Sequence, residues 1–150
     1  MSIDKDINQR LFKSEHQRAL VNLIFTYNWT IEQLKTLFGR HGLTMQQFNI
    51  LRILRGSKKP ISTLQIRERM LDKMSDTSRI VDRLVIKKLA KKVLCKTDKR
   101  LVDVSITEKG KTLLQHIDLE ENQIENILHS LSAKEAKTLN KLLDKIRKFK

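Results

Sequence analysis

The chain has 150 residues, about one domain's worth, and a formal net charge of +14. We find neither an apolar run long enough to cross a bilayer nor a secretory signal, so we expect a cytoplasmic protein without membrane attachment. The single cysteine, Cys95, excludes an intramolecular disulfide and fits a reducing compartment.

The positive charge is concentrated in one third of the chain. Between Arg52 and Leu101 there are sixteen Lys or Arg residues and five Asp or Glu, a net of +11, so the remainder carries only +3. Such a segment is typical of proteins that bind polyanions, because each neutralised phosphate releases counterions. A solvated basic face that aids solubility is the alternative, but it would suit evenly spread lysines better.

The N-terminal part of the chain contains one long helical pattern. Residues 1 to about 15 are polar, and we expect them to be frayed or only partly helical. From His16 to Phe38 the apolar residues recur at alternating four- and three-residue steps, which predicts an amphipathic helix of about six turns. Gly39 and Gly42 are expected to end it.

Capping boxes mark the starts of three further helices. In each box a Ser or Thr side chain accepts from the backbone N–H three residues later, and the Gln or Glu there accepts from the capping residue's own N–H. The three pairs are Thr44 with Gln47, Ser62 with Gln65, and Ser132 with Glu135. The first predicts a helix that stops at Gly56, and the second a short helix that reaches residue 70 or 71.

A helix with arginines on its polar side is predicted from Ser75 to Lys88. Ser75 is expected to cap its start, with Asp76 beside the positive end of the helix dipole. The expected buried stripe consists of Ile80, Val81, Leu84 and Val85. Three residues are then left on the other side, where they can face a partner: Thr77, Arg79 and Arg83. With the short helix before it, this helix makes a helix-turn-helix.

Two strands joined by a basic turn are predicted next, at residues 92–96 and 101–106. The turn, residues 97–100, holds two cations and one acid. Beyond this wing, Thr107 is predicted to cap a long helix that the pair 131–132 breaks before the last helix. The apolar stripes of the first helix and of the last two exceed what one protomer can bury, so we expect a homodimer held by terminal helices.

The segment from Leu84 to Gly110 resembles the signature of the MarR family of bacterial transcription regulators. In that family an Asp-X-Arg lies in the wing, which Asp98 and Arg100 match. A Leu-Thr-X-X-Gly-like segment leads from the wing into the next helix, and residues 106–110 nearly match it. The order of the predicted elements agrees over almost the whole chain.

Two positions differ from that pattern. Lys88 stands where the family usually has the glycine that ends the recognition helix, and Lys92 stands where it usually has an arginine. The lysine removes the low-cost left-handed cap, which leaves the shape of the helix end open. Both substitutions keep the cationic character of the segment.

The resemblance implies a mainly α fold with a small two-stranded β-wing, in which a winged helix-turn-helix core is flanked by terminal dimerisation helices. Within a single MarR-like domain of residues 1–150, we place the core at about 44–107 and the dimerisation helices at about 7–39 and 108–149. The implied function is a sequence-specific regulator of transcription. It would be a homodimeric repressor that binds a pseudo-palindromic operator in double-stranded DNA until a small effector releases it.

Two groups of side chains are the candidates for DNA contacts. Arg79 corresponds to the family's usual arginine in the recognition helix, and the family's wing arginine, here Arg100, enters the minor groove while Asp98 orients it. The recognition-helix candidates are Ser75, Thr77, Ser78, Arg79 and Arg83. The wing candidates are Lys96, Asp98, Lys99 and Arg100, with phosphate contacts from Lys91 and Lys92. The structural alternative is that the arginines pair with Asp76, Asp82 and Asp98 on a solvated surface.

Enzymatic and metal-binding functions find little support in the sequence. It contains no Gly-rich phosphate loop, no His-Glu-X-X-His and no cysteine pair, so we expect no catalytic residue, no metal and no cofactor. His116 with Glu120 is better interpreted as a solvent-facing pair than as part of a metal site. Cys95 is better explained as a packed strand residue than as an oxidant sensor.

The resemblance also implies a pocket for small aromatic anions between the dimerisation helices and the core. Tyr27, Trp29 and Phe48 come from elements near such a place, but bulky apolar groups of this kind are more often plain core, so we name no ligand residue. Two other functions remain open. One is an architectural protein that coats DNA without sequence preference, and the other is a metabolite or metal sensor with weak DNA binding.

Overall fold

The computed structural model describes residues 3–8, 11–94 and 102–148 of the chain. The chain folds into two compact units, which divide between Leu114 and Gln115. Within the described residues no helix is both long and apolar enough to cross a membrane.

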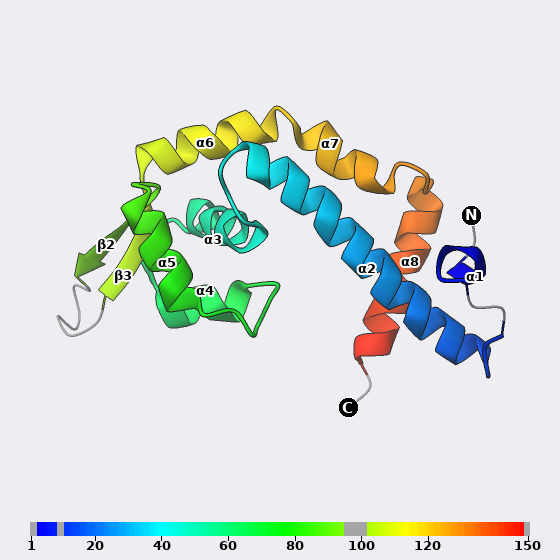
Figure 1. The fold of residues 1–150 in the computed structure, drawn as a ribbon. Coiled ribbons are helices and arrows are strands. Elements are labelled where there is room, and N and C mark those ends of the chain that lie inside the picture. The colour runs from blue at the N-terminus through cyan, green and yellow to red at the C-terminus, as the bar shows by residue number, and fades with distance from the viewer. Residues whose placement is uncertain (1–2, 9–10, 95–101, 149–150) are drawn as a thin grey trace. The chain divides into compact units, whose positions relative to one another are not determined.

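The first unit contains most of the secondary structure (Figure 1). In chain order its elements are α1 (Ile3–Asp6), α2 (Glu15–Arg40), α3 (Met45–Gly56), β1 (Ile61–Ser62), α4 (Thr63–Arg69), α5 (Thr77–Ile86), β2 (Ala90–Leu94), β3 (Val102–Ile106) and the start of α6 (Glu108–Asp118). The second unit contains the end of α6, α7 (Glu121–Glu125), the 3-10 turn η1 (Asn126–Leu128) and α8 (Ala133–Arg147). The predicted fold class, mainly α with a small wing, is confirmed.

The sheet has three strands and not the two that were predicted. Its order is β1-β3-β2 with antiparallel pairing, and β1 contributes the short pairing of Ile61 with Val104. A strand of two residues gives no alternation that a sequence pattern could reveal. The hairpin strand β2 begins at Ala90, two residues earlier than predicted, and pairs there with Ile106.

The core of the first unit lies where the C-terminal half of α2 meets the helix-turn-helix. The rings of Phe38 and Phe48 stack with their centroids 4.0 Å apart, and both side chains are buried. Phe48 is therefore part of the core, which was the plainer of its two interpretations. The fully buried side chains around this pair come from α3, α4, α5 and β3 and include Ile50, Leu51, Ile66, Val81, Leu84 and Val104.

The three predicted capping boxes are all present. Thr44, Ser62 and Ser132 each accept from the backbone N–H three residues later, and the Gln or Glu there accepts in return. The first long helix begins a little earlier than predicted, with Ser14 as its N-cap, and runs past Gly39 to Arg40. Gly42 follows with φ of +66°, a left-handed conformation that suits glycine.

The long helix predicted after the wing is interrupted. It ends as α6 at Asp118, and Glu120 takes up φ −97° and ψ 12° before α7 begins. The N–H of Glu120 donates to the Ile117 carbonyl over 2.9 Å, a tight three-residue turn in place of continued α-helix. The apolar spacing does not reveal this break, because the apolar residues keep a helical period across it.

Gly110 lies in tight contact with the segment that follows α5. A Cβ atom at this position would lie 2.3 Å from the Leu89 carbonyl oxygen and 2.8 Å from Cγ1 of Ile106. Thr107 holds the same junction, because its N–H donates to the Leu89 carbonyl over 3.1 Å and its hydroxyl donates to the Lys88 carbonyl over 2.8 Å. The same hydroxyl accepts from the Gly110 N–H, as expected of a helix cap. The Thr-X-X-Gly pattern therefore has a packing reason.

The substitution Gly110→Ala should lower the free energy of unfolding by about 1–3 kcal/mol, because the new methyl group would overlap backbone atoms that cannot move freely. Urea unfolding followed by circular dichroism measures this. Gly39→Ala is the matched control: no atom lies within 4 Å of a Cβ placed there, so it should be neutral or stabilising by up to about 1 kcal/mol. Equal stability of the two variants would contradict the packing argument.

Candidate nucleic-acid interface

The start of α5 is capped by Asp76 and not by Ser75 as predicted. Oδ1 of Asp76 accepts from the Arg79 N–H over 3.1 Å. The Ser75 hydroxyl is engaged elsewhere, since it donates to Oδ2 of Asp72 over 2.6 Å. This hydrogen bond, with a second one from the Met74 N–H, lowers the pKa of the Asp72 carboxyl below its usual value. The Ser75 hydroxyl is therefore hydrogen-bonded within the turn before α5, and the next residue, Asp76, is the N-cap.

The buried stripe of α5 begins one turn earlier than predicted. Thr77 is only 5% exposed, and its hydroxyl donates to the Met70 sulfur over 3.3 Å. The prediction that Thr77 lies on the exposed side is therefore wrong. Thr77, Val81 and Leu84 have the spacing of one helical face, and all three are buried.

Arg79 and Arg83 are exposed on the opposite face of α5. Within the described part of the chain, neither guanidinium group has an ion-pair partner. The two acids that could have paired with them have other partners, because Asp76 caps the helix and Asp82 pairs with Nζ of Lys92 over 2.6 Å. Among the described residues, the Arg–Asp ion pairs of the structural alternative therefore do not form on this helix.

The two lysines predicted to contact phosphate differ in their surroundings. Lys92 is half exposed and joins β2 to α5 through its ion pair with Asp82. Lys91 is exposed and lies opposite Ser105 in the β2–β3 register. Lys91 is thus the more available of the two cations.

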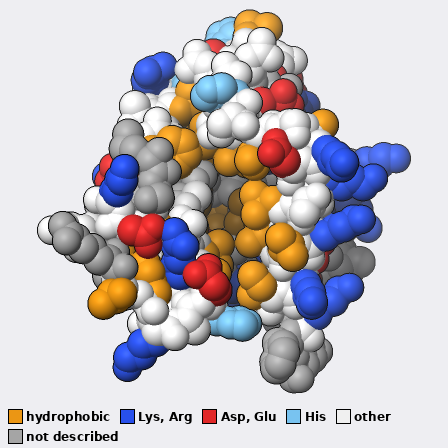
Figure 2. Space-filling view, turned by 90° about the vertical axis from the view of Figure 1, so that its right-hand side faces the viewer, with side chains coloured by type: hydrophobic (Ala, Val, Ile, Leu, Met, Phe, Trp, Pro, Cys, Tyr) orange, Lys and Arg blue, Asp and Glu red, His pale blue; other side chains and the backbone are white. Residues whose placement is uncertain are grey.

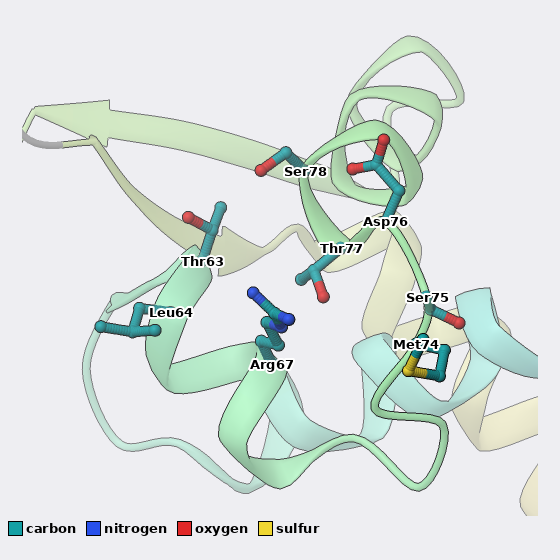
Figure 3. Close-up of a pocket in the computed structure, with 8 residues that line it drawn as sticks. All are labelled: Thr63, Leu64, Arg67, Met74, Ser75, Asp76, Thr77 and Ser78. Carbon is teal, nitrogen blue, oxygen red and sulfur yellow. The ribbon is translucent and has the colours of Figure 1, made fainter.

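A pocket of about 380 Å³ lies between α4 and the start of α5 (Figure 3). Arg67 extends into it from α4, opposite the first turn of α5 that carries Ser78. The pocket brings a guanidinium group and hydroxyl donors together with the Asp76 carboxylate. It is lined by Thr63, Leu64, Arg67, Met74, Ser75, Asp76, Thr77 and Ser78. Arg67 was not singled out from the sequence, although it lies in the last turn of the short helix that precedes the recognition helix.

The C-terminal end of α5 keeps a left-handed cap without glycine. Lys88 has φ of +60°, and the N–H groups of Leu89 and Lys88 donate to the carbonyls of Leu84 and Val85, each over 2.9 Å. This pair of hydrogen bonds is the Schellman motif that usually ends in glycine. The helix end therefore has the usual shape although the residue is a lysine. The left-handed conformation of Lys88 is sterically unfavourable, because the residue has a Cβ atom.

We expect Lys88→Gly to be more stable than Lys88→Ala by about 1 kcal/mol, because both remove the charge but only glycine adopts a positive φ without steric cost. Thermal unfolding of the two variants under one buffer condition gives the comparison. If alanine matched glycine, a left-handed Lys88 would be ruled out.

The wing is described only as far as the β2–β3 ladder, which reaches the pairing of Leu94 with Val102. The predicted wing contacts lie outside the described residues: Lys96, Asp98, Lys99 and Arg100, together with Cys95. Among the described residues no group of three His, Cys, Asp or Glu side chains could hold a metal ion.

No family model and no curated protein matches the sequence. Solved structures do match. A MarR transcription factor from Planctomyces limnophilus is 30% identical, with 89% of this chain and 98% of that chain covered and a TM-score of 0.68. Two others at lower identity show the likeness of the fold. A mutant MarR from E. coli in complex with operator DNA is 24% identical, covering 85% of this chain and 93% of that chain with a TM-score of 0.75.

The third is BpsR from Bordetella bronchiseptica, whose DNA binding is regulated by 6-hydroxynicotinic acid. It is 21% identical, covers 94% of this chain and 99% of that chain, and has a TM-score of 0.78. The solved structures that this chain resembles are those of transcription regulators and not of enzymes. The chain belongs to the MarR family of transcription regulators.

Proposed function

We propose that the protein is a homodimeric repressor that binds a pseudo-palindromic operator in double-stranded DNA. The observation that carries this proposal is the exposed face of α5, where Arg79 and Arg83 have no ion-pair partner within the described residues while nearby acids are engaged elsewhere. Guanidinium groups in this state can donate to guanine edges or phosphate oxygens in the major groove. The E. coli protein was solved with operator DNA, which supports the same role here.

The contacts to DNA would be divided between helix and wing. Ser78, Arg79 and Arg83 are the recognition-helix residues that we place against the major groove, with Lys91 on phosphate. Ser75 and Thr77 serve the local structure of α5, so we assign them a supporting role. In the wing, Arg100 would contact the minor groove, oriented by Asp98. Lys96 and Lys99 would contact the DNA backbone, and Lys92 would make a weaker contact with a phosphate.

Dimerisation would use the helices on either side of the winged-helix core. On α2, the side chains of Leu20, Ile24 and Tyr27 have the spacing of one helical face and are each more than half exposed. On α8, Leu139, Leu142 and Ile146 have the same kind of spacing and are 37%, 54% and 61% exposed. Figure 2 shows hydrophobic side chains at the surface of the face that it views. Apolar stripes of this kind mark association surfaces, which supports dimerisation helices at about 7–39 and 108–149 around a core at about 44–107.

A small molecule would release the repressor from DNA. The regulation of BpsR by 6-hydroxynicotinic acid supports an effector of this class. The physical mechanism is a population shift, in which the effector binds better to the dimer whose two recognition helices do not match the half-site spacing. Tyr27 and Trp29 are partly exposed aromatic residues of α2, and they are the described side chains best suited to line such a site.

The dimer is tested by sedimentation at micromolar concentration, where we expect a single dimeric species. Ile24→Lys should produce monomers, because it places a charge in the centre of the α2 stripe. Leu71→Lys is the matched control, since Leu71 is 79% exposed and lies outside the terminal helices. A wild-type protein that sediments as a monomer would refute the dimer.

The DNA contacts are tested by alanine substitution. Arg79→Ala and Arg100→Ala should each reduce affinity for the specific duplex by about 1–3 kcal/mol while the dimer stays intact. Lys91→Ala should weaken binding to all duplexes alike and lower the salt slope by about one. Lys145→Ala on α8 removes the same charge elsewhere and serves as the control. Fluorescence anisotropy titrations over a range of salt give all of these values, and an unchanged affinity for either arginine variant would remove that residue from the interface.

A further inference from the structure

Lys87 links the end of α5 to the corner between α2 and α3. It is the C-cap residue of α5, and its ammonium group donates to the Gly42 carbonyl and to Oε1 of Gln47, the latter over 3.1 Å. These contacts join residues that are 45 and 40 positions apart in the chain. The DNA contacts proposed above do not use this side chain.

Both acceptors are themselves fixed in the first unit. Gly42 sits in a left-handed turn, where its N–H donates to the Gly39 carbonyl over 2.9 Å. Gln47 is 4% exposed, and the oxygen that accepts from Lys87 also accepts from the Thr44 N–H over 3.2 Å. Movement of the ammonium group would therefore disturb the capping box of α3 as well as the α2–α3 turn.

A cation suits this position better than a neutral donor. The carbonyl of Gly42 follows directly after the C-terminal end of α2, and Lys87 itself stands at the C-terminal end of α5. Both helix ends carry the negative pole of a helix dipole, which favours a positive charge between them. A neutral side chain of the same length at position 87 would lack this electrostatic attraction.

The other side of the same helix end is held by α6. Nζ of Lys109 donates to the Lys87 carbonyl over 3.3 Å, and the Thr107 hydroxyl donates to the Lys88 carbonyl. The end of α5 is thus tied to the α2–α3 corner through the Lys87 side chain and to the start of α6 through its backbone. These attachments restrict how the helix axis can tilt.

We infer that Lys87 is a positioning residue that sets the angle at which α5 presents its arginines to DNA and couples that angle to the C-terminal end of α2. The inference rests on the proposed function. Arg79 lies eight residues away, about 12 Å along the helix, so a tilt of about 5° at Lys87 moves it by about 1 Å. A shift of that size is enough to lengthen a hydrogen bond to a base edge beyond its useful range.

Specific binding and salt dependence separate this role from a direct phosphate contact. For Lys87→Met we expect affinity for the specific duplex to fall by about tenfold, with non-specific affinity changed by less than about twofold and the salt slope kept. Lys87→Arg should recover most of the loss, because it retains a charged donor. Lys91→Met is the comparison for a phosphate contact, and Lys145→Met the control for net charge.

Two results would overturn the inference. If Lys87→Met weakened all duplexes alike and lowered the salt slope by about one, Lys87 would be a phosphate contact. If its specific affinity equalled that of the wild type, the helix angle would not depend on it. A wild type that discriminates no sequence would instead refute the proposed function.

Hydrogen exchange in the absence of DNA tests the attachment of Lys87 to the α2–α3 corner, whatever the DNA-binding measurements show. In Lys87→Met the amides of Gly42 and Leu43 should exchange several-fold faster than in the wild type, because the corner loses its attachment to α5. Lys91→Met should leave their rates unchanged. Equal rates in the wild type and Lys87→Met would show that the lysine does not hold the corner.

Discussion

The contact between the Leu89 backbone and Gly110 fixes how the end of α5, the base of the hairpin and the start of α6 meet. At this junction the chain leaves α5 through left-handed Lys88, and the Leu89 carbonyl accepts from the Thr107 N–H. The next residue, Ala90, opens β2 and pairs with Ile106, the last residue of β3. The helix end, the base of the wing and the start of α6 therefore share one set of contacts. In the DNA complex that we propose, the recognition helix and the wing reach neighbouring grooves, and this shared junction would support both.

The acids of this region determine which cations remain available. Asp76 caps α5, Asp82 pairs with Lys92, and Asp72 accepts from the turn before α5. These three carboxylates are engaged by local partners, and Arg79 and Arg83 of α5 have no ion-pair partner within the described residues. An interface with DNA requires this separation, because a guanidinium group already bound to a carboxylate gains less from a phosphate or a base.

Sequence patterns predicted the features that depend on neighbouring residues. The capping boxes of Thr44, Ser62 and Ser132 could be predicted because both partners lie within four positions of each other. The cap at Thr107 could be predicted for the same reason. The choice between Ser75 and Asp76 could not be made locally, since both are good caps. It was decided by Asp72, which takes the Ser75 hydroxyl.

Features that depend on tertiary contacts were missed. The buried Thr77 contacts the Met70 sulfur at the end of α4, and β1 exists only because β3 pairs with it. The link from Lys87 to Gly42 spans 45 positions and leaves no periodic signal. Among the wing candidates, Asp98 and Arg100 came from the resemblance to the family, and Lys96 and Lys99 from the positive charge of the segment. All four lie outside the residues that the structure describes.

Selection of bound duplexes from a randomised DNA library would show whether the protein recognises a specific operator. At about 150 mM salt, non-specific phosphate binding is suppressed and base readout decides which duplexes survive. If the protein is a dimeric operator-binding regulator, a two-fold symmetric motif should be enriched whose half-sites lie about one helical turn apart, roughly 10 base pairs. Binding at low salt without enrichment of any sequence would contradict the proposed function and would favour a protein that coats DNA through charge alone.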